Sequence, residues 1–443
     1  MKKEQTYNFK EKAHNFIDLF AGCGGLSLGA QKAGFKGILA IESQKNAFDT
    51  LKHNLIDTST AGIRNKLKIE GFEWPEKIEK KNHDIISFLK TNKDYLKSIK
   101  GTVDLIVGGP PCQGFSNAGK RKEDDPRNQL YKSYLDFVEA VNPKIILIEN
   151  VAGIASKFNK TSKSYKDNII DKLEKKYYVD GKLLSSEIFG VPQKRMRYII
   201  IGFNKDFFHN KININEVFDR IEKESKKFTQ NYKIGNETFN ILNTTAGMAL
   251  EDLDGKATGI KKQNFSDDNA KSKTFKTFPY KEPTNDYQRM MQFAIDKTKQ
   301  VDSHRIGEHK AETVYKYKTL IKITKRSKRD SFNFTNEEFV EARWNSKKQI
   351  INVLKDNKPS PTLTTCPFDY IHYNSPRILT VREYARIQSF PDWFEFKGIY
   401  ATSGSMSYTT PRYTQIGNAV PPLMAEGILV VLKSYLKSVN LKR

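Results

Sequence analysis

The sequence predicts an α/β protein in which a twisted, mostly parallel sheet carries helices, with a smaller domain inserted before the C-terminal segment. Short apolar runs end in glycine or in a carboxylate and are followed by helical patterns. The length of 443 residues suggests two or three domains, at roughly 100–200 residues each. The composition changes near Asn204, after which Lys, Asn, Thr and Asp dominate and long apolar runs are few.

The charge balance favours a polyanionic partner. The chain has 75 Lys and Arg residues against 51 Asp and Glu, which gives a net charge of +24. Basic side chains displace counterions from phosphates, so this excess points to a nucleic acid. An AT-rich coding genome would also enrich lysine, and the many Asn and Ile residues agree with that alternative.

Three cysteines, Cys23, Cys112 and Cys366, are too few and too scattered for a disulfide framework. None of them has zinc-ligand spacing with another cysteine or with any of the seven histidines, so no metal site is expected. The N-terminal residues lack the apolar stretch of a signal peptide, and no run approaches the ~20 apolar residues of a membrane span. We therefore expect a soluble, cytoplasmic protein, monomeric and without a membrane partner.

The first predicted element is a strand over 16–20, followed by the glycine turn 21–25 and a helix from Leu26. A strand, a glycine turn and a helix form a mononucleotide-binding opening, because glycine lets the backbone approach a ligand closely. The spacing differs from Gly-x-Gly-x-x-Gly, so a pyrophosphate ligand is not inferred. A second strand over 37–41 ends at Glu42, a carboxylate that can accept hydrogen bonds from ribose hydroxyls. The polar, lysine-rich residues 57–82 are predicted to form a loop or insertion.

The third predicted strand, over 103–107, leads into a stiff turn made by Pro110 and Pro111. This turn presents Cys112 at the end of the strand, where ligands and reacting groups collect in open α/β sheets. The polar residues 117–125 suit a mobile active-site loop. A helix then follows, with a core stripe from Leu130 to Val141.

The fourth predicted strand, over 144–148, ends at Glu149, a position that suits proton chemistry. Strand alternation places Arg195 and Arg197 on one face, just before an apolar strand over 199–201. Two guanidinium groups aimed the same way suit a base carbonyl or a phosphate.

Two C-terminal segments start helices. Thr380 and Glu383 form a capping box that predicts a helix ending before Pro391. Pro421 and Pro422 suit the first turn of a second helix, whose apolar positions predict a core face.

Several of these segments resemble motifs of the DNA (cytosine-5)-methyltransferases. The run Pro-Pro-Cys-Gln-Gly-Phe-Ser over 110–116 resembles the family's nucleophile loop, and residues 16–25 resemble its S-adenosylmethionine loop. Glu149-Asn150-Val151 and the pattern Gln-x-Arg-x-Arg over 193–197 also match. Residues 380–391 and 415–422 resemble the ninth and tenth motifs. The matches cover 14–203 and about 357–437, in the family's order.

The resemblance implies S-adenosyl-L-methionine as cofactor and a cytosine in double-stranded DNA as substrate. Cys112 would be the nucleophile, Glu149 would stabilise the N3 side of the ring, and Arg197 with Arg195 would hold its O2. Cofactor-binding positions would be Phe20, Ala21, Gly22, Gly24, Gly25, Leu26, Glu42, Asp84, Ile85, Pro111, Leu130 and Asn418. DNA-binding positions in the loop would be Gln113 and Ser116. Ser43 and Gln44 depart from the family pattern, so a stacking contact with adenine is not carried over.

The resemblance also implies a domain order within a Rossmann-like methyltransferase fold. Residues 14–203 would form the first part of the catalytic domain, 204–355 the target-recognition domain, and 356–443 the C-terminal return that completes the catalytic domain. The basic cluster over 325–329 could contact phosphates or could be a solvated face.

Alternative functions remain open at this point. A tRNA cytosine-5 methyltransferase shares the fold, although the large basic region 204–355 favours duplex DNA. Amino-methyltransferases lack the nucleophilic cysteine, so Cys112 argues against them. A catalytically silent DNA-binding protein is disfavoured by Cys112, Glu149 and Arg197 together. Bacterial relatives commonly act beside a cognate restriction endonuclease, which is a possible partner.

Overall fold

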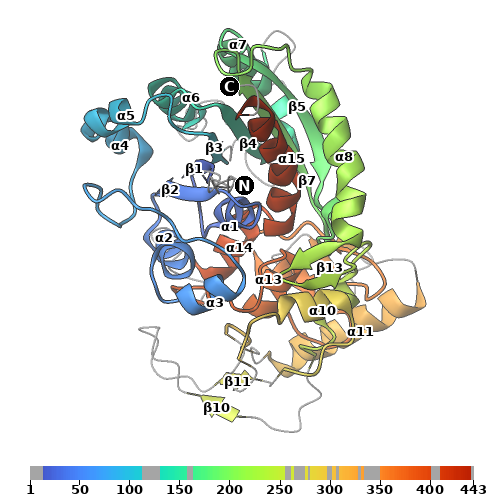
Figure 1. Ribbon diagram of the computed structural model, residues 1–443. Helices are drawn as coiled ribbons and strands as arrows, with labels where there is room; N and C mark the ends of the chain where they lie inside the picture. Colours follow the sequence, from blue (N-terminus) through green and yellow to red (C-terminus); the bar gives the residue numbers. More distant parts are fainter. Residues whose placement is uncertain are drawn as a thin grey trace, which may run out of the picture.

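The computed structural model describes residues 13–111, 130–156, 163–254, 261–263, 275–277, 280–296, 302–305, 309–327, 331–333, 350–400 and 410–440. A large sheet with its helices fills the upper part of Figure 1, and short strands lie with α10 and α11 at the opposite end. One continuous apolar core joins the sheet to the helices of the C-terminal segment.

The large sheet has six strands in the order β2-β1-β3-β4-β7-β5. Strands β1 to β4 pair in parallel, whereas β7 is antiparallel to both β4 and β5. The predicted α/β fold with a mostly parallel sheet is therefore confirmed, since β7 is the strand of this sheet that runs against the other five. The strands are β1 Asn15–Leu19, β2 Lys36–Ile41, β3 Leu105–Gly108, β4 Ile145–Val151, β5 Tyr177–Ser185 and β7 Met196–Asn204.

The sequence did not predict β5. This strand lies at the edge of the sheet and most of its side chains are only half-buried, so it lacks the apolar run that marks β3 and β4.

In the chain, the helices of the catalytic region alternate with these strands, and in space they pack beside the sheet (Figure 1). The predicted helices from Leu26 and over Leu130–Val141 are present as α1 and α6, and the core stripe of α6 is buried at Tyr134, Leu135, Val138 and Val141. The helical segments up to β7 are α1 Gly25–Lys32, α2 Lys45–Leu51, the π-helical turn Lys52–Ile56, α3 Ala61–Lys66, α4 Ile85–Thr91, α5 Lys93–Ser98, α6 Leu130–Val141, the 3-10 turn Ala152–Ala155, α7 Tyr165–Leu173 and the 3-10 turn Ser186–Phe189.

Residues 57–82 are more ordered than the predicted loop. They contain α3, and Ile69, Trp74 and Ile78 are buried in the main core. Their apolar side chains are too widely spaced to show a helical or strand period, which explains why composition alone suggested a polar insertion.

The final helix, α15 Pro422–Asn440, packs against α1. The stretch Arg412–Lys437 is long and apolar enough to cross a membrane by composition, which corrects the expectation that no such run exists. Its most apolar window is 78% buried inside the protein, so this segment belongs to the protein core.

Helix α8, Ile214–Gln230, lies beside α15 and β5, although its residues fall in the predicted recognition region (Figure 1). Its buried face, formed by Ile214, Val217, Phe218 and Ile221, belongs to the main core. The change in composition at Asn204 therefore precedes a helix that still packs against the main sheet.

A second, smaller core lies beyond α8. It is formed by α11 Ala311–Arg326 and a three-stranded sheet of β12 Ser331–Asn333, β13 Ile350–Val353 and β15 Tyr370–Ile371. Tyr317, Leu320 and Ile321 of the helix meet Phe332, Ile351, Val353 and Ile371 of the sheet. The other elements between α8 and α11 are β8 Tyr232–Ile234, β9 Glu237–Phe239, α9 Ala246–Leu250, β10 Lys261–Gln263, β11 Phe275–Thr277 and α10 Asp286–Met291. The buried residues of β8, β9, α9 and α10 belong to the main core.

The C-terminal return is held in place by polar contacts. The predicted capping box is present at α13, Val381–Ile387, where the Thr380 and Glu383 side chains each accept from the other's backbone N–H. Strand β14, Ser360–Pro361, pairs with β6, Gln193–Lys194. The 3-10 turn Pro367–Asp369 and helix α14 Arg412–Asn418 complete this segment.

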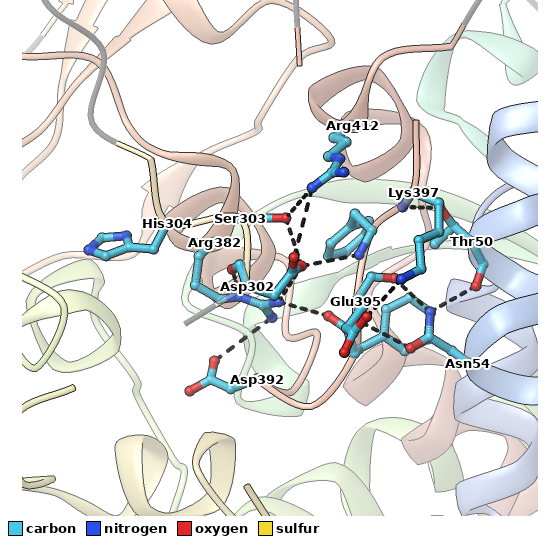
Figure 2. Close-up of polar contacts among 12 residues, drawn as sticks. Thr50, Asn54, Asp302, Ser303, His304, Arg382, Asp392, Glu395, Lys397 and Arg412 are labelled. Carbon is cyan, nitrogen blue, oxygen red and sulfur yellow. Dashed lines mark hydrogen bonds and ion pairs between the residues drawn. The ribbon is translucent and has the colours of Figure 1, made fainter. Parts of the chain in front are cut away.

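A polar cluster joins this return to residues 302–305 and to α2. Figure 2 shows the Asp302 carboxylate between the guanidinium groups of Arg382 and Arg412, at 3.2 Å and 3.8 Å. Asn54 pairs with the backbone of Glu395 in both directions, at 2.7 Å and 2.9 Å. Segments far apart in the sequence are thus fixed to one another by partly buried, directional contacts.

Candidate active site

The turn after β1 has the backbone conformation that its glycines predict. Phe20, Gly22 and Gly24 all have positive φ angles, of 59°, 56° and 97°. A Cβ added at Gly22 would meet no atom within 4 Å, so this part of the turn faces open space. A Cβ at Gly25 would lie 2.2 Å from the carbonyl oxygen of Val420. The turn is therefore open at Gly22 and packed against the C-terminal return at Gly25.

Glu42 follows β2 and lies against this turn. One oxygen of its carboxylate accepts from the backbone N–H of Gly22 at 2.9 Å, and the other accepts from that of Gln44 at 2.6 Å. Burial raises the pKa of Glu42, and these backbone hydrogen bonds oppose the rise. Ser43 also hydrogen-bonds to this carboxylate through its backbone and its side chain, so the carboxylate is held firmly at the end of β2.

Asp84 caps the N-terminus of α4, where its carboxylate accepts from the backbone N–H of Ser87 at 2.9 Å. Ile85 behind it is buried. The segment before Asp84 is tied to the end of β2, because His83 donates its N–H to the carbonyl of Glu42 and Asn82 donates to that of Ser43, both at 2.8 Å. The structure thus brings together the segments that carry two predicted cofactor-binding residues, Glu42 and Asp84.

The tenth-motif segment reaches the same place from the other end of the chain. The Cys23 thiol lies 3.5 Å from the carbonyl oxygen of Gln415, and Asn418 is exposed at the end of α14. Leu130 is half-buried at the start of α6.

The end of β3 lies over Glu149. A Cβ at Gly109 would lie 3.1 Å from the Glu149 carboxylate, and the Asn150 side chain donates to the carbonyl of Pro110 at 3.0 Å. Glycine and the following prolines therefore bring the backbone close to this carboxylate. Pro111 is the last described residue before the loop, so Cys112, Gln113 and Ser116 lie outside the described residues.

Glu149 and Arg197 form a buried ion pair. The Arg197 Nε lies 2.7 Å from the Glu149 carboxylate, and each side chain is about 10% exposed. The two residues lie on adjacent antiparallel strands, β4 and β7. Arg197 is opposite Val151, which is two residues after Glu149. The structure therefore joins two residues that the sequence singled out separately.

Arg195 has a different environment. One terminal nitrogen of its guanidinium donates to the carbonyl of Leu363 at 3.0 Å, and the other donates to that of Gly417 at 2.7 Å. Burial lowers the pKa of Arg195, and the nearby charge of Arg197 adds to this effect. The side chain predicted to hold a base thus binds two carbonyl groups of the C-terminal return.

Asp18 is a residue of this region that the sequence reasoning missed. It is fully buried at the end of β1, where one oxygen accepts from the Ser27 hydroxyl at 2.6 Å. Burial raises the pKa of Asp18 to about 7; the Ser27 hydrogen bond opposes the rise and the charge of Glu42 adds to it. A carboxylate inside an otherwise apolar strand was the signal that could have identified it.

Comparison with known proteins adds three findings. The family model described as C-5 cytosine-specific DNA methylase matches residues 14–434. The type II methyltransferase M.DdeI of Desulfomicrobium norvegicum is 29% identical over 429 residues, which cover 96% of this chain and 90% of that protein. The type II methyltransferase M1.HphI of Haemophilus parahaemolyticus is 28% identical over 418 residues, covering 93% and 85%.

Among solved structures, a protein from E. coli assigned as a DNA modification methyltransferase encoded within a prophage is similar to the whole chain. The TM-score is 0.60 at 26% identity, and the match covers 96% of this chain and 100% of that one. The similarity therefore includes both the main sheet and the smaller region.

Proposed function

The chain belongs to the C-5 cytosine-specific DNA methylase family, whose methyl donor is S-adenosylmethionine, and we propose that it methylates C5 of a cytosine flipped out of a specific double-stranded DNA sequence. The observation that carries the proposal is the buried pair of Glu149 and Arg197 beneath Gly109, three residues before Cys112. Base flipping is required because the reacting atoms of a cytosine are inaccessible within the duplex.

The residues around the β1 turn fit the cofactor. Gly22 leaves open space beside the backbone, and the Glu42 carboxylate lies against the same turn as an acceptor for ribose hydroxyls. Asp84 and Asn418 would reach the same ligand from α4 and α14. When bound, S-adenosylmethionine supplies an electrophilic methyl group.

Cytosine C5 is a weak nucleophile, and we propose that the chain activates it by covalent addition. The Cys112 thiolate adds to C6 while Glu149 stabilises the protonated N3 side of the ring. Arg197 holds O2 and fixes the orientation of Glu149 through their 2.7 Å contact. After C5 accepts the methyl group, loss of the C5 proton and elimination of the thiolate release 5-methylcytosine and restore Cys112.

Arg195 acts as a positioning residue in this proposal. By binding the carbonyls of Leu363 and Gly417, it fixes the C-terminal return beside the start of β7, which carries Arg197. Asn418 directly follows Gly417, so the same contacts connect the catalytic pair to the cofactor side of the site.

We propose that DNA recognition resides in residues 235–355 rather than in all of 204–355. The packing of α8 against β5 and α15 supports the later boundary. Since the relatives named above are type II methyltransferases, we further propose that methylation protects DNA from a cognate restriction endonuclease.

Duplex DNA carrying 5-fluorocytosine at the target tests the proposal. Fluorine at C5 cannot leave as a proton does, so wild-type protein should form an adduct that survives denaturation. Cys112→Ser should lose both the adduct and methylation, because a hydroxyl is a far weaker nucleophile at neutral pH. Cys23→Ala and Cys366→Ala are the matched controls and should retain the adduct.

An equal adduct with Cys112→Ser would refute the role of Cys112. Bisulfite sequencing of DNA from expressing cells would identify the methylated site. Methylation of tRNA with no methylation of duplex DNA would refute the proposed substrate.

A further inference from the structure

Helix α11 of the smaller core has a strongly one-sided charge. Its sequence contains Lys316, Lys318, Lys322, Lys325 and Arg326 against a single acid, Glu312, which gives +4 over 16 residues. Figure 1 shows the helix at the rim of the molecule, beside β13. The buried face carries Tyr317, Leu320 and Ile321, so the small sheet fixes which face of the helix meets solvent.

The outward face carries a row of cations. Lys318, Lys322 and Arg326 are all exposed and lie four residues apart, which places them on one side of the helix about 6 Å apart along its axis. No ion pair joins these three side chains to any residue in the part of the chain that the structure describes. Tyr315, one turn before Lys318, is 69% exposed. The row of Tyr315, Lys318, Lys322 and Arg326 is called the α11 face below.

A lysine-rich genome does not account for this face. Helix α8 is 17 residues long and also contains four basic residues, but four acidic residues balance them and its net charge is zero. Both helices therefore have one buried apolar face, but the charges of α8 cancel whereas those of α11 do not. A solvated helix is normally balanced in this way by charges of both signs.

The charge and the side-chain types match the sugar–phosphate backbone of DNA. Lys, Arg and Tyr are among the side chains that contact phosphates, and such contacts position a protein on the duplex without reading sequence. One strand of DNA presents a phosphate about every 3.4 Å along the axis, so a row of about 12 Å spans several phosphates.

We propose that the α11 face binds the backbone of duplex DNA beside the recognition sequence and contributes affinity rather than sequence specificity. This inference rests on the proposed action on DNA. The cluster of residues 325–329 noted in the sequence contributes through Arg326, since Lys325 donates to the side chain of Asn374 at 3.1 Å.

The test compares two triple variants of the full-length protein that remove equal charge. Lys318→Gln, Lys322→Gln and Arg326→Gln neutralise the α11 face, and Lys223→Gln, Lys226→Gln and Lys227→Gln neutralise exposed positions of α8. Binding to a duplex with the target site and to one without it is measured between about 50 and 200 mM salt, the range over which phosphate contacts dominate the change.

The α11 variant should bind both duplexes roughly tenfold or more weakly, with the ratio between them and the methylated site unchanged. The slope of log affinity against log salt should fall by about 2–3, since each phosphate contact contributes about 0.9. The α8 variant should behave as wild type. A variant with Lys318→Arg, Lys322→Arg and Arg326→Lys should retain wild-type binding.

Unchanged affinity and slope in the α11 variant, or an equal loss in the α8 variant, would overturn the inference. A change in the sequence that the α11 variant methylates would also overturn it, because this would indicate base readout. A loss of binding to duplex RNA with unchanged binding to duplex DNA would overturn it as well. Wild-type protein that neither binds nor methylates duplex DNA would instead overturn the proposed function.

Discussion

Replacing Asp18 with asparagine should change how the free energy of unfolding depends on pH. Asp18 is fully buried, and burial raises its pKa to about 7, against 3.8 for a free carboxyl. Between these values the folded protein keeps a proton that the unfolded chain has released. The free energy of unfolding of the wild type therefore falls as pH rises from about 4 to about 7. Above pH 7 it no longer changes through Asp18.

The size of this loss follows from the difference between the two pKa values. At about 1.36 kcal/mol per pKa unit, the loss is on the order of 4 kcal/mol across the whole window and about 3 kcal/mol between pH 5 and 8. Asparagine has the same shape and is neutral throughout, so Asp18→Asn should lack this dependence. The free energy of unfolding of the variant, minus that of the wild type, should rise by about 3 kcal/mol from pH 5 to pH 8.

Urea unfolding of both proteins at several pH values measures this difference. Ser27→Ala provides a second variant, because the Ser27 hydroxyl donates to Asp18 and opposes the rise of its pKa. Its removal should move the pH dependence to higher pH. Parallel pH curves for wild type and Asp18→Asn would refute the reasoning, because Asp18 would then remain ionised in the folded protein.

Three further predictions address contacts of the site. Arg195→Met should lower the free energy of unfolding by several kcal/mol, because two hydrogen bonds from a charged group, at about 1.5–3 kcal/mol each, are lost. Urea unfolding measures this change; a variant of unchanged stability that no longer methylates DNA would indicate direct action on the base. Glu42→Ala should weaken S-adenosylmethionine binding by roughly 1–3 kcal/mol, and unchanged affinity by calorimetry would remove Glu42 from the ribose site. Gly25→Ala should destabilise the protein by roughly 1–3 kcal/mol, since its methyl group would lie 2.2 Å from the Val420 carbonyl; a wild-type melting temperature would contradict that packing.

The sequence predicted the parts of the fold whose signals are local. Strands β1 to β4 are buried on both faces and read as apolar runs, and the capping box at Thr380 is complete within four residues. Strand β5 was missed because a half-buried edge strand carries no such run. The boundary at Asn204 marked a change in composition, whereas the packing of α8 depends on its amphipathic face.

The contacts of the site were only partly predictable. Strand ends identified Glu42 and Glu149, because ligands collect at the carboxyl ends of parallel strands. The partners of Arg195 are separated from it by 168 and 222 residues in the sequence, so its two carbonyl contacts could not be inferred from local pattern. Asp302 contacts Arg382 and Arg412, which are 80 and 110 residues away in the sequence.

These long-range contacts explain why the catalytic domain needs the C-terminal return. The return supplies the Gln415 carbonyl to Cys23 in the cofactor turn, and the Gln415 side chain accepts from Thr50 of α2 at 2.7 Å. One helical turn earlier, Arg412 donates to Ser303 of the inserted region at 3.0 Å. Helix α14 therefore contacts the cofactor side through one residue and the inserted region through another. Because both contacts lie on one short helix, α14 joins the turn after β1 directly to residues 302–305.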